Sequence, residues 1–393
     1  MNTKMKICIA GNNITAKITF LMFKNFGIDC NLLAKKYSED EITKHKVKFI
    51  NRTMAISKLN IDALKYAVDA EKLLSDCGKI EKIAIFNSQK SILSDINFNA
   101  KDFGYNEMGY IIDYNLFCYE IDEKLKEYQI HENTSRISYE NEEYTIYDDK
   151  NSKSYYTHLI LTDSTFNEEI DFQVIYKHYK YKYQEYAITL NIEHTLPHKN
   201  CAIEWFSNLG PLASLPMKNQ NFSNVVCTIP ANLANDLMEM NEDLRNHFIK
   251  DNLISLLKNY LGDIKIIHSP SIFPLQLQLN YDVENKNIIF LGTQNFIMHP
   301  IAGQGFNLII RDIQRLKNAI INQEVEKFKK HIQRKIDIFS MLFATHNLNQ
   351  FFKINNIAIS KLRKTGMYIL NNIHYAKKTI VKNAMGDGKI NTI

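Results

Sequence analysis

Residues 292–312 read GTQNFIMHPIAGQGFNLIIRD, and this stretch decides the fold that we expect for the chain. An apolar run at residues 288–291 precedes it and a helical pattern follows it. The order therefore predicts a buried strand, a glycine-rich turn and a helix. Such a turn brings backbone N–H groups and a helix N-terminus close to an electron-rich ligand. Gly303 and Gly305 lack side chains, so the backbone there can approach that ligand closely.

The N-terminal residues predict the first part of a parallel sheet. Residues 6–10 (KICIA) are typical of a short buried strand, residues 14–26 have helical periodicity, and residues 30–33 predict a second strand. This order is a β-α-β unit, because parallel strands need a crossover connection.

The turn inside that unit, GNNITA at residues 11–16, partly fits a dinucleotide-binding fingerprint. Gly11 and Ala16 stand at the first and third positions of G-x-G-x-x-G/A, whereas Asn13 replaces the second glycine. Ala34 follows the second strand, where an acidic residue would bind a ribose. Alone, the turn fits either an ordinary strand-to-helix connection or a weakened phosphate-binding turn.

The remaining pattern predicts a second, sheet-rich unit and a helical C-terminal part. Residues 172–229 are rich in Tyr, Phe, Ile and Thr with period-two stretches, which predicts antiparallel strands. Further predictions are a helix at 52–70, a strand pair at 80–98, a strand and then a helix at 109–127, strands at 137–148 and 157–161, helices at 231–261, strands at 264–290, and mostly helices from 309 onward.

Composition excludes several classes of protein. The chain has 393 residues, which fits two or three domains, and its 45% hydrophobic and 23% charged residues are ordinary for a globular protein. A net charge of +5 is too small for a general nucleic-acid binder. Six cysteines without a CxxC pair or zinc spacing indicate reduced thiols in a cytosolic protein and no metal site.

The 292–312 stretch, taken with other segments, resembles the FAD-dependent aromatic hydroxylases of ubiquinone biosynthesis, which share the p-hydroxybenzoate-hydroxylase-like fold. The other segments follow the order of that family along almost the whole chain. They are RTMAIS at 52–57, MGYII at 108–112, TDS at 162–164, AIEWFSNLGPLASLP at 202–216 and AMG at 384–386.

The resemblance implies an α/β fold in which a Rossmann-like FAD-binding domain is interleaved with a mainly antiparallel-sheet substrate domain. A helical C-terminal segment follows. The expected FAD-binding domain comprises residues 1–74, 100–170 and 266–325. The expected substrate domain comprises 75–99 and 171–265, and the C-terminal helices comprise 326–393.

The resemblance also implies a function. An FAD-dependent monooxygenase of this family would hydroxylate the aromatic ring of a polyprenylated phenol with molecular oxygen, using NADH or NADPH as electron donor. Pro300 would line the oxygen-reacting face of the flavin ring. His299 would orient the substrate or serve as a structural histidine. The implied cofactor-binding residues are Gly11, Asn13, Ala16, Arg52, Asp163, Gly292, Thr293, Ala302, Gly303, Gln304, Gly305 and Asn307.

Four departures from the family pattern support a second hypothesis. Asn13, Ala34, Ser164 and Thr293 each replace a glycine or a carboxylate that the family places near the cofactor. Each lost contact would weaken binding by about 1–3 kcal/mol. The alternative is therefore a flavin-poor, non-catalytic relative that acts as a subunit or assembly partner of a ubiquinone-biosynthesis protein complex.

Basic clusters near the C-terminus bear on location. Lys361, Arg363, Lys364, Lys377 and Lys378 stand among apolar residues. This pattern resembles a basic amphipathic surface that touches anionic lipid or a partner, and it fits an ordinary solvated helix face better. The expected location is the cytoplasm, with peripheral contact at the inner membrane as an extension of it.

Overall fold

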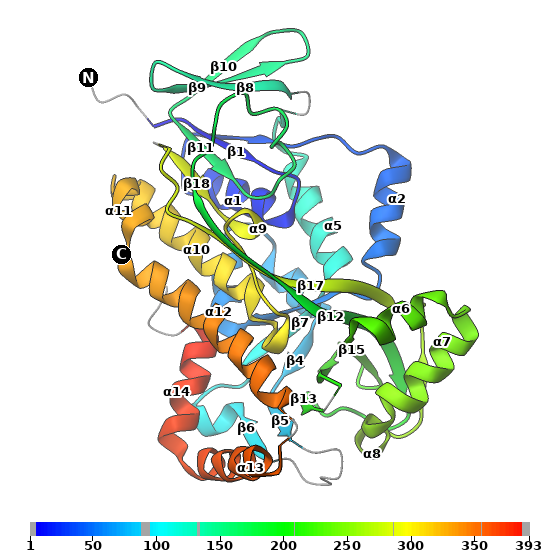
Figure 1. Ribbon diagram of the computed structural model, residues 1–393. Coiled ribbons are helices and arrows are strands. Elements are labelled where there is room, and N and C mark those ends of the chain that lie inside the picture. The colour runs from blue at the N-terminus through cyan, green and yellow to red at the C-terminus, as the bar shows by residue number, and fades with distance from the viewer. Residues whose placement is uncertain are drawn as a thin grey trace.

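A computed structural model gives the arrangement of the chain (Figure 1). It describes residues 5–87, 95–131, 134–207, 209–285, 287–354 and 356–386.

A four-stranded parallel sheet contains the predicted β-α-β unit, in the order β18-β11-β1-β2. Its strands are β1 (Ile7–Ala10), β2 (Cys30–Leu33), β11 (His158–Leu161) and β18 (Ile288–Phe290), and α1 (Ile14–Asn25) connects the first two. One face packs on α1, α5 (Tyr114–Leu125) and α10 (Gln304–Ile321). The other face packs on a small sheet of β8 (Thr134–Glu140), β9 (Glu143–Asp148) and β10 (Lys153–Tyr156). Both faces are covered, which explains why the strands are almost entirely apolar.

A larger, mainly antiparallel sheet forms the second unit, in the order β19-β17-β12-β15-β14-β13-β5-β6, with β16 also paired to β12. Its strands are β5 (Lys82–Phe86), β6 (Ile96–Asn99), β12 (Lys177–His194), β13 (Cys201–Phe206), β14 (Pro211–Pro216), β15 (Phe222–Pro230), β16 (Ile264–Ile266), β17 (Ser271–Tyr281) and β19 (Phe296–Ile297). Helices α6 (Ala231–Glu239), α7 (Glu242–Phe248) and α8 (Lys258–Leu261) lie against one face (Figure 1).

The fold class predicted from the sequence is confirmed. The domain boundaries stay a prediction. Strand β17 lies within residues 266–325, which were assigned to the cofactor domain, yet it pairs along its length with β12 of the large sheet. Hydrogen bonding thus joins the two predicted domains through this strand.

The prediction of a helix over residues 52–70 was partly wrong. Residues 53–57 form β3 (Thr53–Ser57), which pairs with β7 (Gly109–Asp113), and β7 also pairs with β4 (Gly78–Ile80). The helix α3 begins only at Lys58 and ends at Leu64. The pairing partner lies more than fifty residues away, so the local pattern could not reveal it. Of the predicted strand pair at 80–98, residues 88–94 lie outside the described residues.

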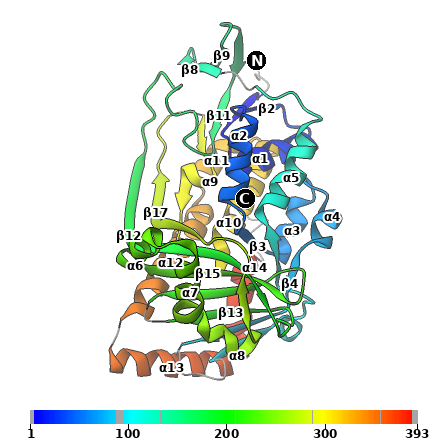
Figure 2. The same ribbon diagram turned by 90° about the vertical axis from the view of Figure 1, so that its right-hand side faces the viewer.

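The remaining elements connect these sheets or extend the C-terminal part. They are α2 (Glu39–Lys48), α4 (Ala70–Ser75), α9 (Gly292–Asn295), α11 (Val325–Lys330), α12 (Ile332–Lys353), α13 (Ile357–Asn372) and α14 (His374–Met385). Both views place α13 at the opposite end of the molecule from β8 and β9 (Figures 1 and 2). Among the described helices, none is both long and apolar enough to cross a bilayer.

Candidate functional site

The first strand-to-helix turn packs directly on the end of β11. Gly11 has φ +151°, and a Cβ atom on it would lie 2.0 Å from Thr162 Oγ1. A side chain at this position would collide with Thr162, and the positive φ also disfavours any residue but glycine. Gly292 at the end of β18 is similar, since its φ is +59° and a Cβ there would lie 2.9 Å from the Thr15 side chain.

Asp163 clamps that turn. Its Oδ2 accepts hydrogen bonds from the backbone N–H groups of Asn12 and Asn13, both at 2.9 Å, and its Oδ1 accepts one from Thr165 N. These bonds use both carboxylate oxygens within the chain. The predicted role of Asp163 near a cofactor would therefore be exerted through the turn that it holds.

Asn13 occupies the N-terminus of α1. Its Oδ1 accepts from Ala16 N at 3.0 Å, and its Nδ2 donates to Thr162 O at 3.0 Å and to Thr293 Oγ1 at 3.4 Å. The Thr293 hydroxyl in turn donates to Thr162 O at 3.3 Å. Two predicted cofactor-binding side chains, Asn13 and Thr293, thus bond to each other and to the protein backbone.

The glycine-rich turn lies against β3. Gly303 has φ +58°, and a Cβ atom on it would lie 2.9 Å from Ala55 Cβ. It precedes α10, whose N-terminus has no side-chain cap, so the Gly305 N–H group is not used by a capping side chain. Gly305 faces Met298, where a Cβ would meet the side chain at 3.4 Å. This backbone is half-buried and suited to an electron-rich group.

Asn307 ties α10 to β3. Its Oδ1 accepts from Ser57 N at 2.8 Å and from Asn60 Nδ2 at 2.9 Å, and its Nδ2 donates to Ala55 O at 2.8 Å and to Gly303 O at 3.3 Å. The buried amide is fully used, so this predicted cofactor-binding residue positions the turn.

Arg52 and Ala302 complete the predicted set. The Arg52 guanidinium lies 4.4 Å from the Tyr114 ring centre and 5.1 Å from that of Phe49, on an exposed side chain that precedes β3. Ala302 lies in the short 3-10 turn Ile301–Gly303, and its side chain is outside the described part of the structure.

His299 is the most enclosed of the predicted residues. Its ring is buried, its Nδ1 accepts from Ile301 N at 3.4 Å, and its Nε2 lies 4.0 Å from Glu185 Oε2. The Tyr183 ring packs on it at 5.1 Å, nearly perpendicular. Burial, with repulsion from Lys353 and His346, lowers the pKa of His299 to about 3. The ring is therefore neutral near pH 7, and because Nδ1 accepts, the proton resides on Nε2.

Glu185 and α12 supply residues that the sequence did not indicate. The Glu185 carboxylate accepts from Lys353 Nζ at 2.5 Å and from Asn349 Nδ2 at 2.8 Å. A second link joins Tyr183 Oη and His346 Nδ1 at 3.0 Å. The sequence signal that could have identified Glu185 is a carboxylate within the aromatic stretch YKYQEY at residues 181–186.

Glu204 was also missed as a functional candidate. It lies on β13 and is paired with Ala213 of β14, and burial raises its pKa to about 8. Ala202, on the same face of β13, packs in a cluster that also contacts Ala55, onto which Gly303 closes. Glu204 therefore shares the face of β13 that Ala202 presents to this cluster.

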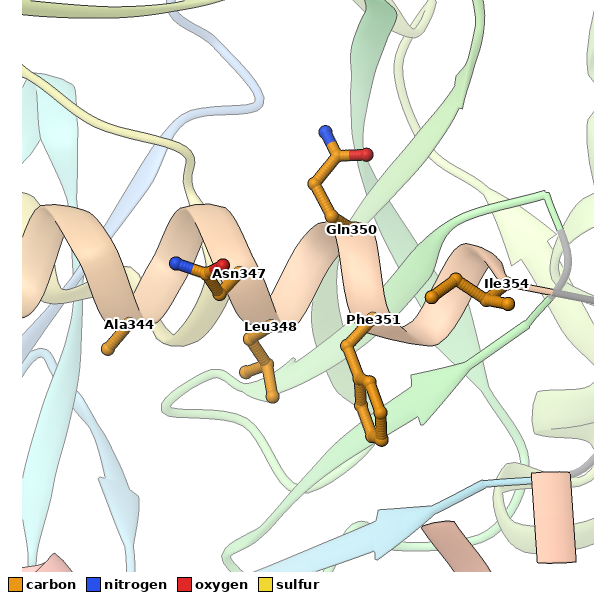
Figure 3. A pocket seen from close by; sticks show the side chains of 6 residues that line it. All are labelled: Ala344, Asn347, Leu348, Gln350, Phe351 and Ile354. Carbon is orange, nitrogen blue, oxygen red and sulfur yellow. The ribbon is translucent and has the colours of Figure 1, made fainter. Parts of the chain in front are cut away.

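A shallow pocket of about 440 Å³ lies along the outer side of α12. Figure 3 shows Leu348 and Phe351 pointing to one side of the helix and Gln350 to the other. Its lining residues are Ala344, Asn347, Leu348, Gln350, Phe351 and Ile354. Within the described ranges, His, Cys, Asp and Glu do not gather into a group that would hold a metal ion.

Sequence comparison finds curated relatives over part of the chain. It is 27% identical over 218 residues to the ubiquinone biosynthesis monooxygenase COQ6 of Dictyostelium discoideum, a match that covers 46% of this chain and 44% of the relative. It is 26% identical over 217 residues to the ubiquinone hydroxylase UbiL of Rhodospirillum rubrum, covering 53% and 49%. The matches thus span about half the length of these relatives. No protein-family profile matches the chain.

Solved structures match over nearly the whole chain. The p-nitrophenol 4-monooxygenase PnpA of Pseudomonas putida has a TM-score of 0.73 at 12% identity, covering 98% of this chain and 100% of that one. HpxO of Klebsiella pneumoniae, complexed with FAD and uric acid, has a TM-score of 0.68 at 12% identity, covering 98% of both. At such identity the likeness shows the fold alone. The resemblance predicted from the motifs is confirmed: the chain is similar in sequence to ubiquinone hydroxylases and has the fold of the FAD-dependent monooxygenases.

Proposed function

We propose that this protein is a flavin-dependent monooxygenase that hydroxylates the aromatic ring of a polyprenylated phenol in ubiquinone biosynthesis, with molecular oxygen as co-substrate. The observation that carries this proposal is the turn at Gly303, which packs on Ala55 and leaves the N-terminus of α10 without a side-chain cap. The similarity to COQ6 and UbiL supports the same reaction class.

The ring-binding end of the site fits a flavin. The backbone N–H group of Gly305, with the positive end of the α10 dipole, would stabilise negative charge on the reduced flavin ring. When bound, the flavin would supply the redox chemistry, with NADH or NADPH as the electron donor. The adenylate end fits poorly, because Asn13, Thr293 and Asp163 are bonded within the chain.

Two polar groups are candidates for contact with the substrate. The neutral His299 carries its proton on Nε2, an atom without a hydrogen-bond partner in the described part of the chain, and burial raises the pKa of Glu204 to about 8, so that its carboxyl is largely protonated near pH 7. Each would offer a hydrogen bond to a phenol hydroxyl and would hold the ring in position. Pro300, half-buried at the entry to the turn, would close the ring-facing side.

We also propose that the protein works at the cytoplasmic side of the inner membrane and docks through its C-terminal helices. Residues 338–386 contain no Asp or Glu and seven Lys or Arg, of which Arg363 is buried and Lys353 pairs with Glu185, so five lysines supply the positive charge of this surface. Large apolar side chains are exposed there, including Phe343 at 72%, Leu362 at 64% and Tyr375 at 80%. Exposed apolar groups among basic residues suit an anionic lipid surface. The inner side of α12 meanwhile contacts Glu185, so one helix would link the lipid face to the site.

A second candidate function is a non-catalytic subunit or assembly partner of a ubiquinone-biosynthesis complex. The specific observation in its favour is the hydrogen bonding of Asn13 to Thr293 and Ala16, in the place where a dinucleotide phosphate would bind.

The two candidates differ in a direct measurement. Protein purified with excess FAD should be yellow, with the visible absorbance bands of a bound flavin, and should consume oxygen with NADH or NADPH when a short-chain prenylated phenol is added. The hydroxylated ring should appear by mass spectrometry. Protein that stays colourless with FAD and forms no hydroxylated product would exclude the enzyme and favour the second candidate.

A further inference from the structure

Two adjacent asparagines tie together the carboxyl ends of the parallel sheet. Asn12 makes a two-point bridge to the backbone after β2, because its Oδ1 accepts from Lys35 N at 2.6 Å and its Nδ2 donates to Lys35 O at 3.1 Å. In a nucleotide-binding sheet of this topology, the end of the second strand is where a ribose lies. The Asn12 side chain spans that position.

Asn13 makes the corresponding links on the other side. It bonds to Thr162 at the end of β11, to Thr293 after β18, and to Ala16 in the first turn of α1. The first-turn N–H groups of a helix are what a pyrophosphate would use, and Asn13 Oδ1 already accepts one of them.

Asp163 adds a charge to this arrangement. Its carboxylate accepts both the Asn12 and Asn13 backbone N–H groups at 2.9 Å. A pyrophosphate would have to compete with the Asp163 carboxylate for these donors, and the negative charges of the two groups would repel each other. The cap and the carboxylate together use the N–H groups of Asn12, Asn13 and Ala16.

We propose that Asn12 and Asn13 close the adenylate half of the site, so that the protein binds a flavin by its ring end and gains little affinity from the adenosine diphosphate part. This inference rests on the proposed function for the identity of its ligand. It predicts a cofactor that exchanges readily, held by the turn at Gly303 and α10.

The test compares FAD, riboflavin and ADP by isothermal titration. In the wild-type protein, FAD should bind within about threefold of riboflavin, and ADP should not bind measurably. Asn12→Gly with Asn13→Gly should raise FAD affinity at least about tenfold, leave riboflavin affinity unchanged and create ADP binding. Wild-type FAD affinity about a hundredfold above that of riboflavin, or a double variant that gains no affinity for FAD or ADP, would overturn the proposal.

Two further variants serve as controls. Asn241→Gly removes an equivalent helix cap on α7, whose side chain accepts from Leu244 N, and should leave every affinity unchanged. Asn12→Ala keeps the Asn13 cap and should give a smaller gain for FAD, which covers the case in which the double variant does not fold. ADP binding separates the two proposals. If no flavin binds but the opened variant takes ADP, the closure is correct and the proposed function is not.

Discussion

His299 Nε2 lies 4.0 Å from the Glu185 carboxylate, although the two residues stand on different elements, a turn after β19 and the long strand β12. Glu185 is held from the other side by Lys353 and Asn349 of α12. The contact brings the glycine-rich turn, the large sheet and the C-terminal helices to one point.

Glu185→Gln should lower the free energy of unfolding by about 2 kcal/mol, because it removes the charge that compensates Lys353 in a largely buried pair. Urea denaturation followed by circular dichroism measures this. Glu123→Gln removes a carboxylate from an exposed pair with Lys126 and should change stability by less than about 0.5 kcal/mol. Equal effects of the two substitutions would show that the Glu185 pair is not structural.

The pH dependence of stability should report on His299. Its folded pKa is about 3, below the ordinary value of 6.5, so the unfolded chain takes up a proton first as pH falls. Stability should therefore be lost as pH falls from 6.5 toward 3, by at most about 1.4 kcal/mol per pH unit from this group. His299→Gln should flatten that slope in urea titrations at successive pH values. His247→Gln, an exposed histidine on α7, should keep it. An unchanged slope in His299→Gln would contradict the assignment.

Gly303→Ala should destabilise the protein by more than Gly27→Ala. Both glycines have positive φ, +58° and +70°, but only Gly303 has a neighbour, the Ala55 methyl, within 4 Å. Gly27→Ala should cost about 1–2 kcal/mol from backbone strain, and Gly303→Ala about 1–3 kcal/mol more from overpacking. Thermal unfolding of Gly303→Ala, Ala55→Gly and the double variant forms a cycle. If the stability changes of the two single variants add up to that of the double variant, residue 303 does not pack against residue 55 of β3.

Binding to lipid should depend on charge at the C-terminal helices. Lys361→Glu with Lys364→Glu should reduce co-sedimentation with phosphatidylglycerol vesicles by at least about tenfold. Added salt should weaken wild-type binding, because the attraction is electrostatic. Lys46→Glu with Lys48→Glu on α2 reverses two exposed lysines elsewhere and serves as the control. Equal binding to neutral phosphatidylcholine vesicles, or no effect of the C-terminal reversal, would refute the docking surface.

Short-range patterns predicted much of the fold. The alternation of apolar runs, glycines and helical periods placed β1, α1, β2, β18 and α10 within a few residues of their observed bounds. These elements are specified by burial periodicity and by turn residues such as Gly11 and Gly303, which are properties of neighbours in the chain.

The failures came from contacts over long separations. Residues 53–57 form a strand because β7 pairs with them, and this pairing outweighs the helical pattern that extends from residue 52. The sequence indicated Asn13 and Asp163 as cofactor-binding residues. It could not show that the Asp163 carboxylate accepts a hydrogen bond from the Asn13 backbone, or that the Asn12 side chain bonds to the Lys35 backbone.

The sequence by itself thus determined the α/β fold, the glycine-rich turn and the positions at which the dinucleotide pattern is broken. Tertiary structure alone decided what fills those positions and which groups meet His299. A hydrogen bond or an ion pair depends on the distance and direction between its atoms. Folding brings Glu185, His299 and Lys353 together from segments that are far apart in the sequence, so local patterns cannot predict their contacts.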